Sequence, residues 1–157
     1  MGVLSLKQDD FLILRHLRQN ARENLTGISR KTKIPVSTLF DRLKQLEKGM
    51  IHRYTSLLDF RKMGFTVRPT LLIRCDPSDR EELKKYLFYN EHVNTLTRVN
   101  NGYDFLVECI FKDMDTHQEF IDHLAPFRAE IKEHFVLEEL KRETFLSNDL
   151  NLALVMR

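Results

Sequence analysis

The sequence predicts an α+β protein in which an N-terminal winged helix-turn-helix precedes a ferredoxin-like βαββαβ domain. Two observations predict this order. Apolar residues recur at helical spacing as far as Gly49, and short β-rich segments then alternate with helical ones. The formal charge also changes sign, since residues 1–64 carry 13 Lys and Arg against 6 Asp and Glu, whereas residues 65–157 carry 12 against 17.

These changes in pattern and charge set the expected domain boundaries. We expect a winged helix-turn-helix domain over residues 1–58 and a hinge over residues 59–65. The ferredoxin-like domain is expected over residues 66–143, and residues 144–157 are expected to form a C-terminal tail whose contacts the sequence does not indicate.

Three short helices are predicted in the first domain. The first begins at the aspartates Asp9 and Asp10 and runs to about residue 19, and the second spans about residues 26–32. The third begins near Pro35 and ends at Gly49, because proline suits a first helical turn and glycine a C-terminal end. Residues 50–58 are rich in β-formers and are predicted to be the strand or hairpin of the wing.

The second domain alternates strands with helices. Asn101 and Gly102 form a dipeptide typical of a two-residue hairpin turn. Two helices would cover one face of a four-stranded sheet and leave uncovered the other face, which includes Leu106 and Ile110. We therefore expect a second copy of the chain to pack there. The predicted strands span residues 67–75, 93–99, 103–111 and 131–141, and the predicted helices span residues 78–90 and 115–127.

Several function classes find no support in the sequence. It contains no apolar run near the roughly 20 residues of a membrane span, and no phosphate-binding glycine loop, nucleophile elbow or HExxH motif. His117, Glu119 and His123 share one predicted helix, which we interpret as solvated surface and not as a metal site. Cys75 and Cys109 lack CxxC spacing and are predicted to be buried, reduced thiols. We expect a cytoplasmic protein that is not an enzyme and holds no cofactor or metal.

The third predicted helix has the pattern of a helix that enters the major groove of double-stranded DNA. Leu39, Leu43 and Leu46 fall on one face, and polar and basic residues fall on the other. Hydroxyl and amide side chains can reach base edges, and Lys and Arg can reach phosphates. The predicted DNA-binding residues are Arg30, Lys31, Ser37, Thr38, Asp41, Arg42, Lys44, Gln45, Lys48 and Arg53.

Three of these assignments have alternatives. Asp41 either accepts a hydrogen bond from cytosine or pairs with Lys44 or Arg42. Ser37 and Thr38 either contact bases or only solvate the first turn of the helix. The net charge of +7 on residues 1–64 favours DNA binding over a helix face that contacts nothing.

Four stretches resemble the leucine-responsive regulatory protein/AsnC family of transcription regulators, over about residues 6–145. The family's first helix is similar to LKQDDFLILRHLRQNAR, and its helix-turn-helix is similar to ISRKTKIPVSTLFDRLKQLEKGMI. Its wing and hinge resemble IHRYTSLLDFRKMGF, and its C-terminal hairpin resembles NGYDFLV. The resemblance implies a nucleoid-associated regulator that binds specific DNA sequences, with a C-terminal domain for regulation and oligomerisation.

The resemblance also implies partners for that C-terminal domain. Members of the family form homodimers, which associate into tetramers, octamers or larger discs. An amino acid or a similar small effector binds near the hairpin. The effector-binding residues that the resemblance implies are Asn100, Asn101, Gly102, Tyr103 and Asp104.

Three positions depart from the family pattern. Pro35 stands where Ser or Thr often begins the recognition helix, and one residue fewer separates Glu47 from Ile51. Asn101 stands where the hairpin motif has glycine, with a glycine one position later, whereas Asp104 matches the motif's aspartate. We therefore expect the wing to point in a different direction, and the hairpin turn to have a different backbone conformation, from those that the family pattern implies.

Two other functions fit parts of the pattern. A nucleoid-structuring protein that binds DNA without an effector would fit the lysines of the third helix and the altered hairpin. A sirohaem decarboxylase-like enzyme would share the two-domain layout. The N-terminal part of this chain is more basic than such enzymes would suggest, and their haem-handling residues are not evident in it.

Overall fold

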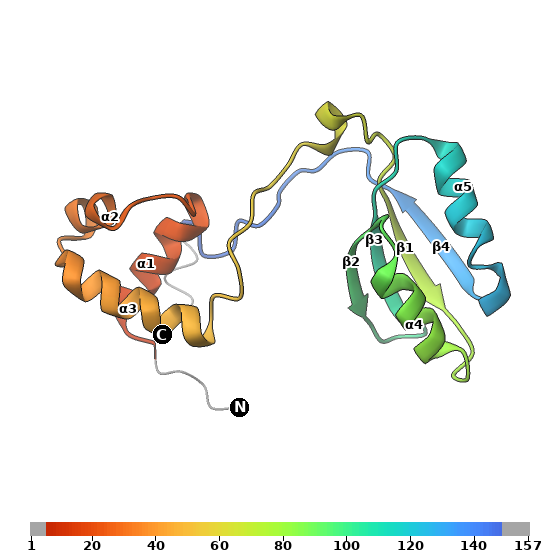
Figure 1. Cartoon of the computed structure of the whole chain (residues 1–157), viewed down its shortest axis with the longest axis horizontal. Helices are drawn as coiled ribbons and strands as arrows, with labels where there is room; N and C mark the ends of the chain where they lie inside the picture. The colour runs from red at the N-terminus through yellow and green to blue at the C-terminus, as the bar shows by residue number, and fades with distance from the viewer. Residues whose placement is uncertain (1–5, 149–157) are drawn as a thin grey trace. The chain divides into compact units, whose positions relative to one another are not determined.

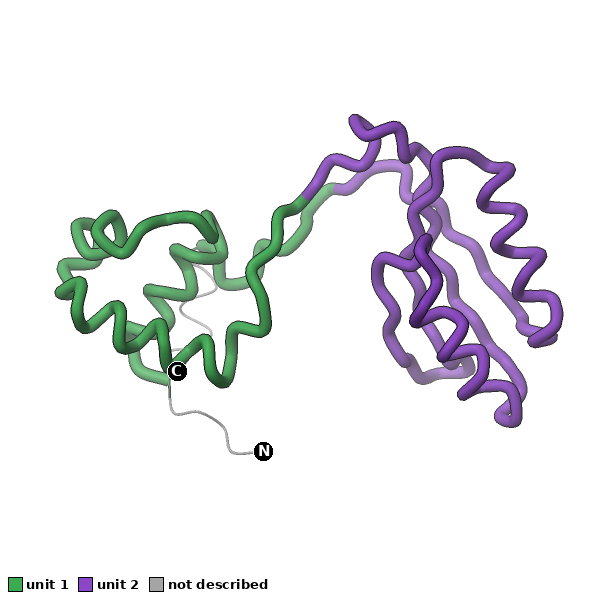
Figure 2. Tube along the Cα trace, viewed as in Figure 1, with its two compact units in different colours: residues 1–57, 140–157 green, residues 58–139 purple. Residues whose placement is uncertain are grey.

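The computed structural model describes residues 6–148. The chain divides into two compact units, one made of residues 1–57 with residues 140–157 and the other of residues 58–139 (Figure 2). We call them unit 1 and unit 2. The functional boundaries proposed at residues 58, 65 and 143 stay predictions.

Unit 1 contains the three predicted helices, which are confirmed to within about two residues. Their bounds are α1 (Gln8–Gln19), α2 (Leu25–Thr32) and α3 (Val36–Gly49) (Figure 1). The helices pack around one small apolar core, which burial of apolar surface stabilises. Its buried residues are Ile13, Leu14, Ile28, Leu39 and Leu46.

Local hydrogen bonds begin the first two helices. The backbone N–H of Lys7 donates to Asp10 Oδ2 at 2.8 Å, which closes a capping box at the start of α1. The backbone N–H of Gly27 donates to Asn24 Oδ1 at 2.7 Å and caps α2. Lys33 then adopts a left-handed conformation, with φ of 64°, and ends α2 before the chain enters α3.

The wing strand predicted over residues 50–58 is wrong. The described chain contains no strand between residues 51 and 59. The hydroxyl of Tyr54 donates to Glu47 Oε1 at 2.9 Å, which ties this segment to the end of α3. Residues with β propensity form a strand only when a neighbouring strand takes up their backbone hydrogen bonds. Within the described residues, no strand pairs with this segment.

Unit 2 has the predicted βαββαβ order. Its sheet is antiparallel, with strand order β2-β3-β1-β4. Two 3₁₀ turns, η1 (Phe60–Met63) and η2 (Ala125–Phe127), precede β1 and β4. The remaining elements are β1 (Pro69–Arg74), α4 (Arg80–Tyr89), β2 (Val93–Arg98), β3 (Phe105–Cys109), α5 (Met114–Asp122) and β4 (Glu130–Phe135).

Both helices of unit 2 pack on the same face of the sheet, over a shared core (Figure 1). Residues on the opposite face, which we call the open face, include Leu72, Leu106 and Ile110, all of them half-buried. Both cysteines are free and buried, as predicted. The core residues are Leu71, Ile73, Cys75, Leu83, Leu87, Phe105, Val107, Cys109, Phe111, Phe120 and Leu124.

The last predicted strand was too long. It ends at Phe135, which pairs with Pro69, the first residue of β1. The backbone N–H of Val136 still donates to the carbonyl of Arg68 at 3.0 Å. Beyond that bond β1 offers no further partner, so the chain leaves the sheet.

The beginning of the predicted tail contacts α1. Arg18 donates to the carbonyls of Phe145 at 3.0 Å and Glu143 at 2.8 Å. Gln19 donates to the carbonyl of Ser147 at 2.5 Å. The rest of the tail, residues 149–157, lies outside the described residues, as do residues 1–5 of the first predicted domain.

His117 does not lie on solvated surface, so that interpretation is wrong. It is 3% exposed, and its Nε2 lies 2.8 Å from Glu133 Oε2 on β4. Glu119 and His123 are exposed. Residues 6–148 contain no cluster of His, Cys, Asp and Glu suited to a metal ion. Over the same residues, the helices are too short and too polar to cross a membrane.

Candidate functional site

The helix α3 presents a polar and basic surface, as the sequence predicts. Leu39 and Leu46 are buried on one side of the helix, and Leu43 is partly buried beside them. The helical repeat of 3.6 residues places a second set of residues together on the opposite side. Short polar residues lie near the start of α3, and lysines lie towards its end. The exposed members of this set are Ser37, Asp41, Lys44, Gln45 and Lys48, and Thr38 at the edge is half-buried.

Arg42 points to the protein interior and not to this surface. Its Nη1 lies 3.4 Å from Oδ2 of Asp10 on α1, and the side chains of Arg42 and Asp10 are 17% and 5% exposed. The pair joins α3 to the start of α1. Since a guanidinium engaged with a buried carboxylate is not available to a phosphate, the structure gives Arg42 a positioning role that the sequence assignment missed.

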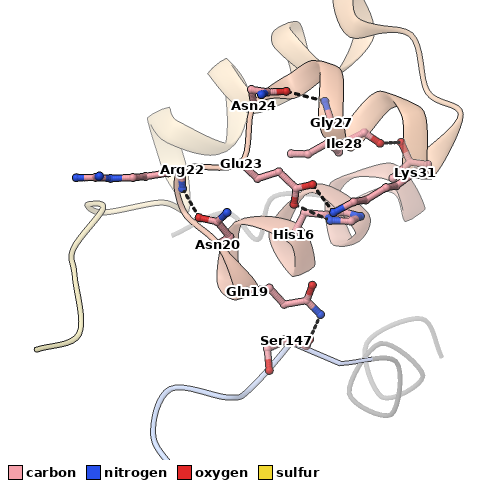
Figure 3. Close-up of polar contacts among 11 residues, drawn as sticks. His16, Gln19, Asn20, Arg22, Glu23, Asn24, Gly27, Ile28, Lys31 and Ser147 are labelled. Carbon is pink, nitrogen blue, oxygen red and sulfur yellow. Dashed lines mark hydrogen bonds and ion pairs between the residues drawn. The ribbon is translucent and has the colours of Figure 1, made fainter. Parts of the chain in front are cut away.

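Lys31 belongs to a charged cluster between α1 and α2 (Figure 3). Its Nζ lies 2.5 Å from Glu23 Oε1, and His16 Nδ1 lies 3.0 Å from Glu23 Oε2. The Lys31 hydrogen bond is the main cause that lowers the pKa of Glu23. Lys31 is exposed, but it would approach a phosphate with part of its charge already compensated by Glu23. Arg30 and Arg53 are exposed as well.

Two apolar residues on α3 were missed by the sequence assignment. Val36 is 43% exposed and Phe40 is 47% exposed. Lys44 Nζ lies 4.4 Å from the centroid of the Phe40 ring, within the range of a cation–π interaction. Helical spacing already places both residues next to Ser37 and Lys44, but a prediction based on polar groups leaves apolar residues out.

The hairpin between β2 and β3 has the predicted turn. Asn101 and Gly102 have φ values of 62° and 88°, and the backbone N–H of Val99 donates to the carbonyl of Asp104 at 3.0 Å. Positive φ at both central positions is the type I′ pattern. Asparagine tolerates this conformation better than other residues with a side chain, so Asn101 can form this turn although it is not a glycine.

Asp104 is engaged within unit 2. Its Oδ2 accepts the backbone N–H of Cys75 at 3.0 Å, and its Oδ1 accepts Nε of Arg80 at 2.7 Å. The Cys75 N–H, followed by the Arg80 guanidinium, holds the pKa of Asp104 below its usual value. The Asp104 side chain is 12% exposed, so it holds the start of α4 and Arg80 in place.

A cavity of about 370 Å³ lies beside the hairpin, between α4 and β2. Arg80, which Asp104 orients, is part of its wall. Tyr103 instead has Lys132 Nζ 5.3 Å from its ring centroid, and Asn100, Asn101 and Gly102 are exposed. None of the five implied effector residues is part of the lining, and Asp104 is linked to it through Arg80. The lining is Arg80, Glu81, Lys84, Phe88, Val93, Asn94, Leu96, Arg98 and Phe105.

Comparison with known proteins matches both units. Residues 10–49 match the family model of a winged helix-turn-helix that binds DNA, and residues 70–146 match the Lrp/AsnC ligand-binding domain. The transcriptional regulator AzlB of Bacillus subtilis is 30% identical over 128 residues, which cover 77% of this chain and 79% of AzlB. The matched relatives are transcriptional regulators and not enzymes, which leaves the sirohaem decarboxylase-like alternative without support.

Solved structures show the same architecture. The structure of LrpC from Bacillus subtilis aligns with a TM-score of 0.82 at 23% identity and covers 88% of this chain and 99% of that one. A transcriptional regulator of Neisseria meningitidis in complex with L-Met aligns with a TM-score of 0.83 at 25% identity, over 94% of this chain and 98% of that one.

Proposed function

Because the chain belongs to the Lrp/AsnC family of DNA-binding transcriptional regulators, we propose that α3 enters the major groove and that an amino acid bound to unit 2 modulates this binding. The observation that supports this most directly is the exposed face of α3, which runs from Ser37 to Lys48. A helix of this kind fits the width of the major groove of B-DNA.

The proposed contacts divide into two kinds. Phosphate contacts set affinity and register, and base contacts set sequence preference. We assign Lys44, Lys48, Arg30 and Arg53 to phosphates, and Lys31 to a weaker contact because Glu23 shares its charge. The residues assigned to base edges are Ser37, Thr38, Asp41 and Gln45.

The open face of unit 2 supports a homodimer. Leu72 on β1 lies opposite Leu106 on β3, and Glu108 separates this apolar pair from Ile110 on the same face. Polar residues flank the pair, including Thr97 on β2 and Lys132 on β4. An apolar centre with a polar rim is the composition of a protein–protein interface. We propose that two copies pair through this face and that dimers associate further into tetramers or octamers.

The cavity beside the hairpin supports an amino acid as the effector. Arg80 and Arg98 offer guanidinium groups to a carboxylate, while Phe88 and Leu96 offer apolar surface to a side chain. Asp104 acts as a positioning residue because it orients Arg80. The L-Met in the Neisseria meningitidis regulator is an example of such a ligand in a protein of this fold.

Selection of duplexes by the full chain, followed by footprinting of the selected sites, tests the DNA proposal. We expect pseudo-palindromic sites whose protected half-sites lie about 10 base pairs, or a multiple of this, apart. Lys48→Ala should weaken all sequences similarly, whereas Gln45→Ala or Thr38→Ala should alter sequence preference. Uniform coverage without half-sites would contradict the proposal and favour a nucleoid-structuring protein.

Thermal-shift measurements against the twenty amino acids test the effector proposal. A ligand at 100 times its Kd stabilises the protein by about 2.7 kcal/mol, which is a measurable shift. We expect Arg98→Ala and Lys84→Ala to reduce the shift, while Lys85→Ala, an exposed neighbour outside the cavity, leaves it unchanged. An undiminished shift in both cavity variants would place the ligand elsewhere.

A further inference from the structure

We propose that Val36 and Phe40 form an apolar reading strip on α3 that contacts the C5-methyl groups of thymines in each half-site. This inference rests on the proposed insertion of α3 into the major groove and adds the base that the helix prefers. Thymine is the base whose edge offers a methyl group in that groove, so an apolar side chain at the reading surface discriminates in its favour.

The strip is defined by helical spacing. Val36 and Phe40 are four residues apart on α3, so they are neighbours on one side of the helix, and Lys44 follows one turn later. Val36 is the first residue of α3, and in a helix-turn-helix the N-terminal part of the second helix lies closest to the bases. The strip also adjoins Ser37, which is exposed.

The exposed apolar surface of Val36 and Phe40 is available to contact a partner. Leu39 and Leu46 fill the core of unit 1, and neither Val36 nor Phe40 belongs to that core. The two residues stay 43% and 47% exposed to water. Apolar surface left in water becomes favourable to bury when a complementary apolar group arrives, and a thymine methyl in the groove is such a group.

Lys44 contacts the Phe40 ring and orients this part of the strip. Its Nζ lies 4.4 Å from the Phe40 ring centroid, so the ammonium covers one face of the ring and limits its motion. A lysine whose stem follows the aromatic ring can still direct its ammonium to a phosphate beside the base. The same side chain thus orients Phe40 and contributes to affinity.

Replacement of single thymines by deoxyuridine in a selected duplex tests the proposal, because deoxyuridine lacks only the methyl group. We expect the unaltered protein to lose about fourfold in affinity for each contacted methyl, the factor that corresponds to burial of one methyl-sized group. Phe40→Ala should bind the thymine and deoxyuridine duplexes equally at the position that Phe40 contacts. Because affinity for DNA rises as the salt concentration falls, measurements at low salt keep the binding of the Phe40→Ala variant strong enough to quantify.

Tyr89→Ala is the matched control, since it removes an exposed aromatic ring from α4 in unit 2 and should keep the full methyl preference. Two results would overturn the proposal. One is a wild-type protein that is indifferent to deoxyuridine at every thymine of the half-site, a result that needs no variant. The other is a Phe40→Ala variant that loses affinity as much as the wild type at each of these positions. Loss of half-site selection altogether would instead count against the proposed insertion of α3.

Discussion

Replacing Arg42 by alanine distinguishes a residue that stabilises unit 1 from one that contacts DNA. Arg42 Nη1 lies 3.4 Å from the buried Asp10 carboxylate, which also accepts the backbone N–H of Lys7 at 2.8 Å. Breaking a fully buried ion pair costs about 3–5 kcal/mol. Since Asp10 keeps its backbone hydrogen bond and Arg42 is 17% exposed, we expect a loss of about 2 kcal/mol, as for a hydrogen bond to a charged group.

The assay compares urea unfolding of unit 1 with the salt dependence of DNA binding. With a slope of about 1–3 kcal/mol per molar urea, Arg42→Ala should lower the midpoint by roughly 1 M and leave the salt slope of binding unchanged. Lys44→Ala is the matched variant. It should reduce the salt slope by about 1 and change stability by no more than about 1 kcal/mol, the upper value for its exposed contact with Phe40. A reduced salt slope with unchanged stability in Arg42→Ala would refute the positioning role.

Three further predictions concern stability. Asp104→Asn should destabilise unit 2 at pH 7. Because folding lowers the pKa of Asp104, its contribution is present above the unfolded value of about 4 and is lost as the pH falls through the folded value, so urea titrations at pH 7 and pH 3 should show the deficit shrink in acid. Arg18→Ala should speed amide hydrogen exchange in residues 143–147 and leave the sheet of unit 2 unchanged. Leu39→Ala should cost about 2–5 kcal/mol in the unfolding of unit 1, because Leu39 is fully buried.

The elements that the sequence predicted correctly are those whose signals are local. Pro35 and Gly49 bound α3 as expected, and the Asn101-Gly102 dipeptide forms the predicted turn. The apolar spacing of α3 and the alternation along β3 also match the observed burial. Such signals depend on residues a few positions apart, and the structure keeps them because the tertiary contacts agree with them.

The features that the sequence did not predict depend on residues far apart in the chain. Arg42 pairs with Asp10 across 32 positions, and His117 is buried against Glu133. The wing segment lacked a partner strand within the described residues, so its β propensity did not produce one. At Phe40 the limit is chemical, because the apolar character of a residue does not indicate whether it will be buried or stay exposed.

The central claim is that the exposed face of α3 binds DNA, and the dissociation constant of charge-reversal variants for a selected duplex tests it most directly. Lys44→Glu/Lys48→Glu reverses two charges on α3, and Lys85→Glu/Lys112→Glu makes the same change in net charge on exposed lysines of unit 2. At one salt concentration we expect the α3 variant to bind at least about tenfold more weakly than the wild type, and the unit 2 variant to bind like it. Equal affinities for the two variants would contradict the account.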